Sequence, residues 1–230
     1  MNTDLQADRR RIARDAIAIG VATGAYGLSY GAIAVASGLS VAQASFLSLF
    51  AFTGASQFAL VGVVGAGGSV VAAGAAALLL GARNTLYAVR LADVLGVHGL
   101  RRPLAAHLVI DETTAMAVAQ PDPADARRAF WYTGAAVFLC WNVATLVGAL
   151  AGDLIADPAA LGLDAAFPAA FLALMAPRLR ERPALLAAIA GAAVALLATP
   201  FLPAGLPVLL AVVPALAITL WQRAAGRSVR

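Results

Sequence analysis

Several ionisable and polar residues lie inside otherwise apolar stretches of this sequence, where they are costly to place. Arg83 lies near the middle of the apolar stretch 69–95, and a charge at the centre of a membrane helix costs roughly 2.5–3.5 kcal/mol on insertion scales. At helical spacing, Arg83, Tyr87 and Arg90 share one face, with Asn84 about 100° away. This face would bind a carboxylate or hold a buried counter-charge. The alternatives are a purely structural ion pair or snorkelling of the arginines.

The stretch 104–119 supplies the matching acidic residues. His107 and Asp111 stand at i and i+4, on one face if the stretch is helical, while Glu112 points elsewhere. Asp111 or Glu112 would pair with Arg83, or would titrate in a proton path together with His107. The alternative is an interfacial segment whose charges are simply hydrated.

The densest polar run in any apolar stretch is 52–58, within the stretch 41–64. Gly54 allows exposure of the backbone or close approach of another helix. If the helix unwinds there, the backbone together with Ser56 and Gln57 would coordinate a zwitterion or an ion. The alternative is tight helix packing through small residues.

The composition is that of a membrane protein. Hydrophobic residues make up 62% of the 230 residues and charged residues 12%, against roughly 45–50% and about 25% in soluble proteins. The mean hydropathy is +0.86, which excludes a disordered or nucleic-acid-binding chain. A single cysteine, Cys140, excludes an intramolecular disulfide, and two histidines leave little for a zinc site. Without any Lys there is no ATPase phosphate loop. We therefore expect a protein that is not an enzyme and holds no metal or cofactor.

The apolar stretches predict an all-α, polytopic integral membrane protein with seven or eight transmembrane or re-entrant helices. A bilayer core of about 30 Å needs about 20 apolar residues. The expected segments are 17–36, 41–64, 69–95, 104–119, 129–151, 165–176, 184–199 and 206–221. We treat residues 1–230 as one transmembrane domain, with a polar cytoplasmic N-terminal segment, 1–16, and a cytoplasmic tail, 222–230. The stretch 104–119 carries enough charge that it either crosses under the shield of its neighbours or is re-entrant.

The placement of arginines predicts the orientation, because cytoplasmic loops carry an excess of basic residues. Eight crossings with both termini cytoplasmic place most of the arginine clusters inside. Arg101 and Arg102 do not fit this orientation, because they would then lie on the outer side of the membrane. Either the stretch 104–119 does not cross, or this short loop violates the rule.

A weak internal sequence repeat relates the two halves of the chain. Gly38-Leu39-Ser40 opens the second apolar segment, and Gly162-Leu163-Asp164 opens the sixth. Paired, interrupted helices in matching halves are typical of transport sites, whereas chance is the alternative in a chain so rich in Gly and Ala.

Four ordered elements resemble the AzlC family of branched-chain amino acid transport proteins. They are Phe52-Thr53-Gly54-Ala55-Ser56-Gln57-Phe58-Ala59, Arg83-Asn84-Thr85-Leu86-Tyr87, Asp111-Glu112-Thr113-Thr114-Ala115, and Trp141 with Thr145 and Gly148. Two positions depart from the family pattern. Gly81 stands where many members have Asn, and Asn84 stands where many have His.

The resemblance implies the large subunit of a secondary-active exporter of Leu, Ile, Val or Met in the bacterial cytoplasmic membrane. A small hydrophobic AzlD-type membrane subunit is the implied partner, and a proton or substrate gradient is the implied energy source. Substrate binding would involve Gly54, Ser56, Gln57, Arg83, Asn84 and Tyr87; proton coupling or ion pairing would involve Asp111, Glu112 and His107. Two other classes stay open: a channel-like pore, and a non-transporting assembly or regulatory membrane subunit.

Overall fold

The computed structural model describes residues 2–154, 172, 176, 178–203 and 206–224, and within these residues the chain forms helices without strands. The expected segment 165–176 lies almost wholly outside the described residues. So does Gly162-Leu163-Asp164, the second copy of the weak internal repeat. Three described helices are long and apolar enough to cross a membrane: Asp8–Ala36, Val70–Leu95 and Pro123–Asp153. The prediction of an all-α polytopic membrane protein is confirmed.

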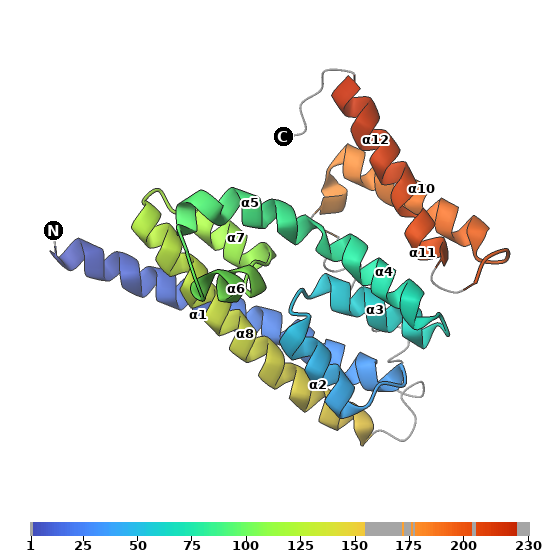
Figure 1. The fold of residues 1–230 in the computed structure, drawn as a ribbon, viewed down its shortest axis with the longest axis horizontal. Coiled ribbons are helices and arrows are strands. Elements are labelled where there is room, and N and C mark those ends of the chain that lie inside the picture. Colours follow the sequence, from blue (N-terminus) through green and yellow to red (C-terminus); the bar gives the residue numbers. More distant parts are fainter. Residues whose placement is uncertain (1, 155–171, 173–175, 177, 204–205, 225–230) are drawn as a thin grey trace.

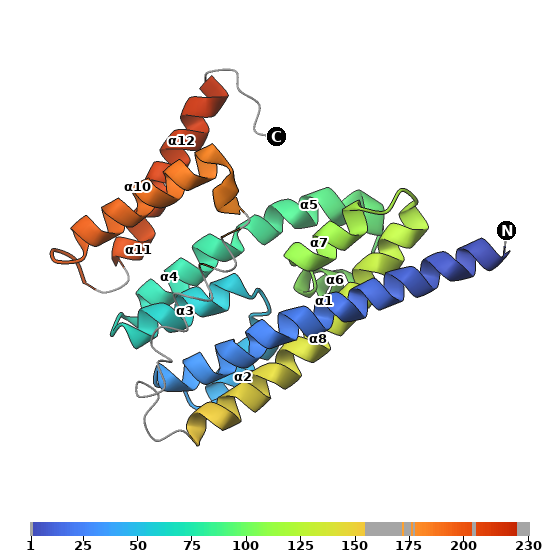
Figure 2. The ribbon, with the colours of Figure 1, turned by 180° about the vertical axis from the view of Figure 1, so that it is seen from behind.

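The two longest helices, α1 (Asn2–Ala36) and α8 (Pro123–Asp153), pack along each other in parallel (Figures 1 and 2). Residue numbers rise together along the contact: Gly20 faces Ala136, Gly24 faces Cys140, Gly27 faces Trp141 and Gly31 faces Thr145. A Cβ on Gly31 would lie 2.1 Å from the Thr145 carbonyl oxygen. The helix backbones therefore approach more closely than a methyl group allows, as small residues permit in membrane helices.

Helix α1 begins earlier than the predicted segment 17–36, because the polar stretch from Asn2 onward is also helical. No Gly or Pro precedes Gly20 in the chain. Asp8 and Arg11 form an i, i+3 ion pair of 3.7 Å on this helix. Such pairs stabilise an exposed helix modestly, so the helix extends past the apolar stretch.

The stretch 41–64 forms two half-length helices, α2 (Val41–Phe50) and α3 (Ala55–Gly65), rather than one membrane-length helix. Ser40 caps α2 in a capping box with Gln43. The break is at Gly54, whose φ of 63° and ψ of −94° suit glycine. At 1.5 Å per residue each helix is about 15 Å long, roughly half of a bilayer core.

These two helices form a hairpin that returns to the end where it starts. Helix α2 runs antiparallel to α8, since Ser48 Oγ donates to Asn142 Oδ1 (2.7 Å) and Phe52 packs against Phe138 further along. Helix α3 runs back parallel to α1: the ring of Phe58 lies 5.6 Å from that of Tyr30 near its start. At its far end, a Cβ on Gly65 would lie 2.7 Å from Ser37 Oγ, at the end of α1.

The chain then crosses the molecule through α4 (Val70–Gly81) and α5 (Arg83–Leu95). Ala82 between them has helical backbone angles, so the two form one span. Helix α4 is antiparallel to α3, because Gly81 lies beside Ser56. Helix α5 ends at the N-terminal end of α8, where the Arg127 guanidinium donates to the Val94 carbonyl (3.2 Å).

A second hairpin follows, built from α6 (Arg101–His107) and α7 (Asp111–Val118). The ring of His107 lies 5.8 Å from that of Phe138, deep along α8. Gln120, just past α7, accepts a hydrogen bond of 3.4 Å from Arg11 near the start of α1. The hairpin therefore returns to the N-terminal end of α1 and α8, which decides for the re-entrant alternative.

Two expectations change as a result. Arg101 and Arg102 lie at the same end of the molecule as Arg127, because α6 begins beside the start of α8, so they no longer stand apart from the other arginine clusters. His107 and Asp111 do not share a helix face, because the chain breaks at 108–110 between α6 and α7. The two hairpins enter from opposite ends of the α1–α8 pair (Figure 1).

The C-terminal part comprises the 3₁₀ turn η2 (Arg178–Arg180), α10 (Arg182–Ala198), α11 (Leu206–Leu210) and α12 (Val212–Ala224). A Cβ on Gly191 would lie 2.8 Å from the Ala211 carbonyl oxygen, so α10 packs tightly against the α11–α12 segment. Leu209 packs against the small-residue cluster between α3 and α4. None of the described C-terminal residues lines the cavity described below.

Candidate functional site

A cavity of about 290 Å³ lies where the tips of the two hairpins approach each other. The first tip contributes Gly54 and the second contributes Asp111, while α1, α5 and α8 complete the wall. The lining residues are Thr23, Tyr26, Phe52, Thr53, Gly54, Ala55, Phe58, Arg83, Ile110, Asp111, Glu112, Val137 and Trp141. The volume lies at the lower end of the range for small-molecule sites, which is about 300–1,000 Å³.

An ion pair joins two sides of this cavity. Arg83 Nη2 lies 2.6 Å from Asp111 Oδ2, and both side chains are 38% exposed. Arg83 is the first residue of α5 and Asp111 is the first residue of α7, so the pair ties the central span to the second hairpin. Within the described structure, Asp111 Oδ1 is buried without a hydrogen-bond partner. The pair therefore keeps acceptor capacity beside the cavity.

The two hairpin tips have the same local construction. The Gly54 N–H donates to Gln57 Oε1 (3.2 Å), which closes the start of α3. The Ile110 N–H donates to Thr113 Oγ1 (3.0 Å), which closes the start of α7. In each tip a side chain three residues further on thus satisfies one backbone N–H where the chain is not helical, which limits the cost of non-helical backbone at membrane depth. Both helix N-termini, with their positive dipole ends, lie at the cavity.

The remaining wall is apolar and aromatic. Phe58 and Trp141 meet edge to face, with centroids 6.3 Å apart and ring planes at 84°. The buried Tyr30 of α1 stacks on Trp141, with ring centroids 6.1 Å apart. Ile110 and Val137 add aliphatic surface. The cavity therefore combines one charged and polar side with one apolar side.

The comparison with protein families decides the identity. The model of the AzlC protein family matches residues 18–155, more than half of the chain. The chain belongs to the AzlC family. The matched region contains α8 and both hairpins, together with every residue that lines the cavity.

Two relatives of this AzlC chain are named only as uncharacterized membrane proteins, both from Helicobacter pylori strains. One is 30% identical over 129 residues, covering 55% of this chain and 57% of the relative. The other is 33% identical over 90 residues, covering 39% of this chain and 40% of the relative. The chain thus spans about half the length of the relatives it matches. No solved structure matches it.

Four of the predicted AzlC site residues line the cavity: Gly54, Arg83, Asp111 and Glu112. They come from three separate elements, and the hairpin tips bring them together. Of the alternatives left open for Arg83, an ion pair with Asp111 is the one the structure contains. The exposed Arg90, expected on the same face as Arg83, is not among the lining residues.

The other predicted residues lie behind or beside the cavity. Ser56 and Gln57 are buried at the start of α3, where Gln57 holds the tip rather than lining the cavity. Tyr87 packs against the main apolar core. The buried Asn84 Oδ1 has no hydrogen-bond partner in the described part of the chain. His107 packs with Phe52 and Phe138, whose ring centroids lie 5.9 and 5.8 Å from its own.

Sequence reasoning missed the contribution of α1. Thr23 and Tyr26 line the cavity, yet the segment 17–36 was predicted only as a membrane helix, without site residues. The signal was present, because Thr23, Tyr26 and Tyr30 follow one another at helical spacing in the middle of an apolar stretch. Asn142 behaves as a packing residue, since its amide nitrogen donates to the Phe138 carbonyl (2.8 Å).

Metal binding has no support among the described residues, where no three His, Cys, Asp or Glu side chains gather closely enough to hold an ion. The charged groups at the cavity are instead one guanidinium and two carboxyl groups, from Arg83, Asp111 and Glu112. This donor set suits a small organic zwitterion better than a cation alone, because both signs of charge are present on one wall.

Proposed function

We propose that the protein is the large subunit of a secondary-active transporter that exports Leu, Ile, Val or Met. The observation that carries this proposal is the Arg83–Asp111 ion pair beside a cavity with an opposite apolar wall. Broken helices that meet near the middle of a membrane protein are a recurrent way to build a transport site. Membership of the AzlC family supports a transport-related role.

The charged wall has the chemistry to hold an amino acid headgroup. Arg83 would bind the substrate carboxylate, and Asp111 or Glu112 would hold the ammonium group or a proton. Because Arg83 Nη2 and Asp111 Oδ2 lie only 2.6 Å apart, substrate binding would replace this one ion pair by two, one from each side chain to the substrate. Such an exchange keeps every charge partnered, which limits the cost of desolvation.

The apolar wall would accept the aliphatic side chain. Phe52, Phe58 and Trp141 present ring surface, and Ile110 and Val137 present methyl groups. An apolar pocket distinguishes side chains by only about 1–3 kcal/mol per methylene. We therefore propose a group of hydrophobic amino acids as substrates rather than a single one.

A small hydrophobic AzlD-type subunit is the proposed partner, and a bacterial cytoplasmic membrane is the proposed location. The concentration of arginines at the N-terminal end of α1 and α8 supports a cytoplasmic position for that end, by the positive-inside rule. We propose outward transport driven by a proton or substrate gradient.

The test is transport of radiolabelled Leu by the purified full-length protein in proteoliposomes, with and without the small subunit. We expect saturable flux that responds to an imposed pH or substrate gradient. A flux that rises linearly with Leu concentration indicates a pore and contradicts the proposal. Absence of flux in every arrangement also contradicts it.

The Arg83→Gln variant is expected to lose Leu transport at least tenfold, because the substrate carboxylate loses its cation. Arg90→Gln is the matched control, since Arg90 lies on the same helix, is exposed and does not line the cavity. Initial rates are compared at equal amounts of inserted protein. Equal rates for Arg83→Gln and the unmodified protein would remove Arg83 from the site.

A further inference from the structure

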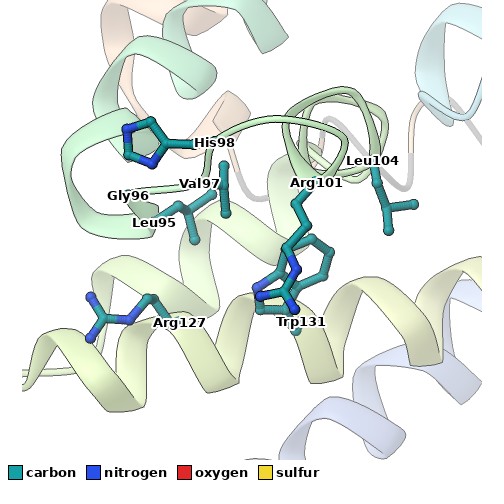
Figure 3. Close-up of a pocket in the computed structure, with 8 residues that line it drawn as sticks. All are labelled: Leu95, Gly96, Val97, His98, Arg101, Leu104, Arg127 and Trp131. Atoms are coloured by element: carbon teal, nitrogen blue, oxygen red, sulfur yellow. The ribbon is translucent and has the colours of Figure 1, made fainter.

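A second, larger cavity lies at the arginine-rich end of the molecule, far along α5 and α8 from the first. Its volume is about 670 Å³, and it lies between the end of α5, the following loop, α6 and α8 (Figure 3). The residues that line it are Leu95, Gly96, Val97, His98, Arg101, Leu104, Arg127 and Trp131. It shares no residue with the proposed substrate cavity.

The charged residues that line this cavity are two arginines, Arg101 and Arg127. Arg101 and Arg127 are exposed, and neither forms a salt bridge within the described residues. Arg127 turns toward the end of α5, where one of its nitrogens donates to the Val94 carbonyl. A guanidinium has five N–H donors, so most of its donors stay available. His98 is also exposed on the same rim.

Nearby acidic groups do not neutralise these arginines. Asp125 pairs with Arg128, on the neighbouring turn of α8. Asp93 lies on the other side of the α5 end, in an adjoining groove that Arg102 also lines. The arginine-rich second cavity therefore keeps an uncompensated positive potential, which attracts an anionic group.

The surroundings are those of a membrane interface. Trp131 lies on the floor of the cavity, and in Figure 3 the Arg101 side chain extends from α6 toward it. Leu100 is 95% exposed beside the two arginines that open α6. Aromatic and basic residues mixed with exposed apolar ones are typical of the lipid headgroup region.

An apolar groove adjoins the basic cavity and points to a lipid rather than a free anion. This groove, of about 520 Å³, runs between α5 and α6 and shares residues 95–98 with the cavity. Ala88, Val89, Ala92 and Ala105 are among the residues that line it. A phosphate alone would leave this groove unused, whereas an acyl chain would fill it.

We propose that the basic cavity binds the headgroup of an anionic phospholipid, with Arg101 and Arg127 on the phosphate and an acyl chain along the α5–α6 groove. Basic pockets between membrane helices on the cytoplasmic side are suited to such headgroups. The lipid would fix the second hairpin against the start of α8. This inference does not depend on the proposed substrate, because the two cavities are separate.

The test adds phosphatidylglycerol or cardiolipin to the purified full-length protein in a mild detergent. The melting temperature and the amount of lipid that stays bound are then measured. Either lipid is expected to raise the melting temperature and to be retained. The Arg101→Gln/Arg127→Gln variant is expected to bind about 25-fold more weakly, at about fivefold for each arginine near an anionic headgroup. Arg9→Gln/Arg10→Gln is the control, because it removes the same charge from exposed positions outside the cavity.

Two further arms separate the sources of the anion. Inorganic phosphate is expected to give no shift in melting temperature at the same concentration, and neither is phosphatidylcholine. An equal shift with inorganic phosphate would overturn the proposal in favour of a free-anion site. An equal shift with phosphatidylcholine, or equal weakening in the Arg9/Arg10 control variant, would show that the cavity has no selective role.

Discussion

Arg83 and Asp111 connect two parts of the fold that are distant in sequence, since one begins α5 and the other begins α7. Because both side chains are 38% exposed, the pair is partly hydrated and contributes on the order of 1 kcal/mol to stability. We expect its larger importance to lie in the proposed transport, because breaking the pair leaves one charge unpaired beside the cavity.

A double-mutant cycle tests this connection. Asp111→Asn leaves Arg83 without its counter-charge and is expected to lower the melting temperature. Arg83→Gln/Asp111→Asn removes both charges and is expected to recover much of that loss while remaining inactive in transport. Thermal unfolding of the four proteins measures the coupling. Strictly additive shifts in melting temperature would contradict an energetic link between the two side chains.

The charged residues of the site were easier to predict from the sequence than the arrangement of the helices around them. The cost of a charge within an apolar stretch identified Arg83, and the acids at Asp111 and Glu112 were recognised as its potential partners. The sequence did not decide between Asp111 and Glu112, because that choice depends on how α7 starts after the break at 108–110. Thr23 and Tyr26 were not predicted, although their helical spacing is visible in the sequence, because neither carries the charge that made Arg83 stand out.

At the scale of elements, the close contact of α1 and α8 forms the frame on which both hairpins pack. A Cβ on Gly148 would lie 2.0 Å from the Leu28 carbonyl oxygen. Only glycine fits at such a position, because a Cβ would overlap the backbone of the facing helix, and backbone cannot move aside as a side chain can. The frame therefore depends on a few glycines along the contact.

Substitution of these glycines tests the frame. Gly31→Ala and Gly148→Ala are each expected to lower the melting temperature strongly, because the new methyl would overlap backbone atoms of the facing helix. Gly24→Ala is the control, since its Cβ would meet Cys140 at an ordinary 3.4 Å. A smaller loss for Gly31→Ala than for Gly24→Ala would contradict the packing described.

The break at Gly54 could be anticipated from the sequence, but the direction of the chain after it could not. A glycine in a polar run indicates that a helix ends, whereas the return of α3 toward Ser37 depends on contacts with α1. For the second hairpin, the charge within 104–119 and the position of Arg101 and Arg102 were the hints that the sequence offered. The glycine spacing along α1 was also visible, but Gly is too common in this chain for the spacing to stand out.

At the scale of the whole molecule, the two hairpins enter from opposite ends of the α1–α8 pair and meet around one cavity. Gly38 and Gly67 follow the C-terminal ends of α1 and α3, opposite to the end where Gly99 precedes α6 and Pro121 follows Gln120, which contacts Arg11. This arrangement places the arginines near both ends of the second hairpin on the same side as the start of α1. It satisfies the positive-inside rule without the violation that a crossing of 104–119 would cause.

Labelling of single cysteines tests this arrangement in a Cys140→Ala background. Cysteines at positions 38 and 67 are expected to react with an impermeant thiol reagent from the periplasmic side, and cysteines at 99 and 121 from the cytoplasmic side only. Labelling of 38 and 67 from opposite sides would show that 41–64 crosses the membrane and would contradict the first hairpin.

Protection of a cavity cysteine by substrate tests the central claim most directly. Thr53 lines the cavity, so Thr53→Cys in the Cys140→Ala background is labelled with a small thiol reagent over a range of Leu concentrations. We expect Leu to slow the reaction saturably, while a cysteine at the fully exposed Leu100 reacts at an unchanged rate. An equal labelling rate at Thr53→Cys with and without saturating Leu would contradict an amino acid site between the hairpin tips.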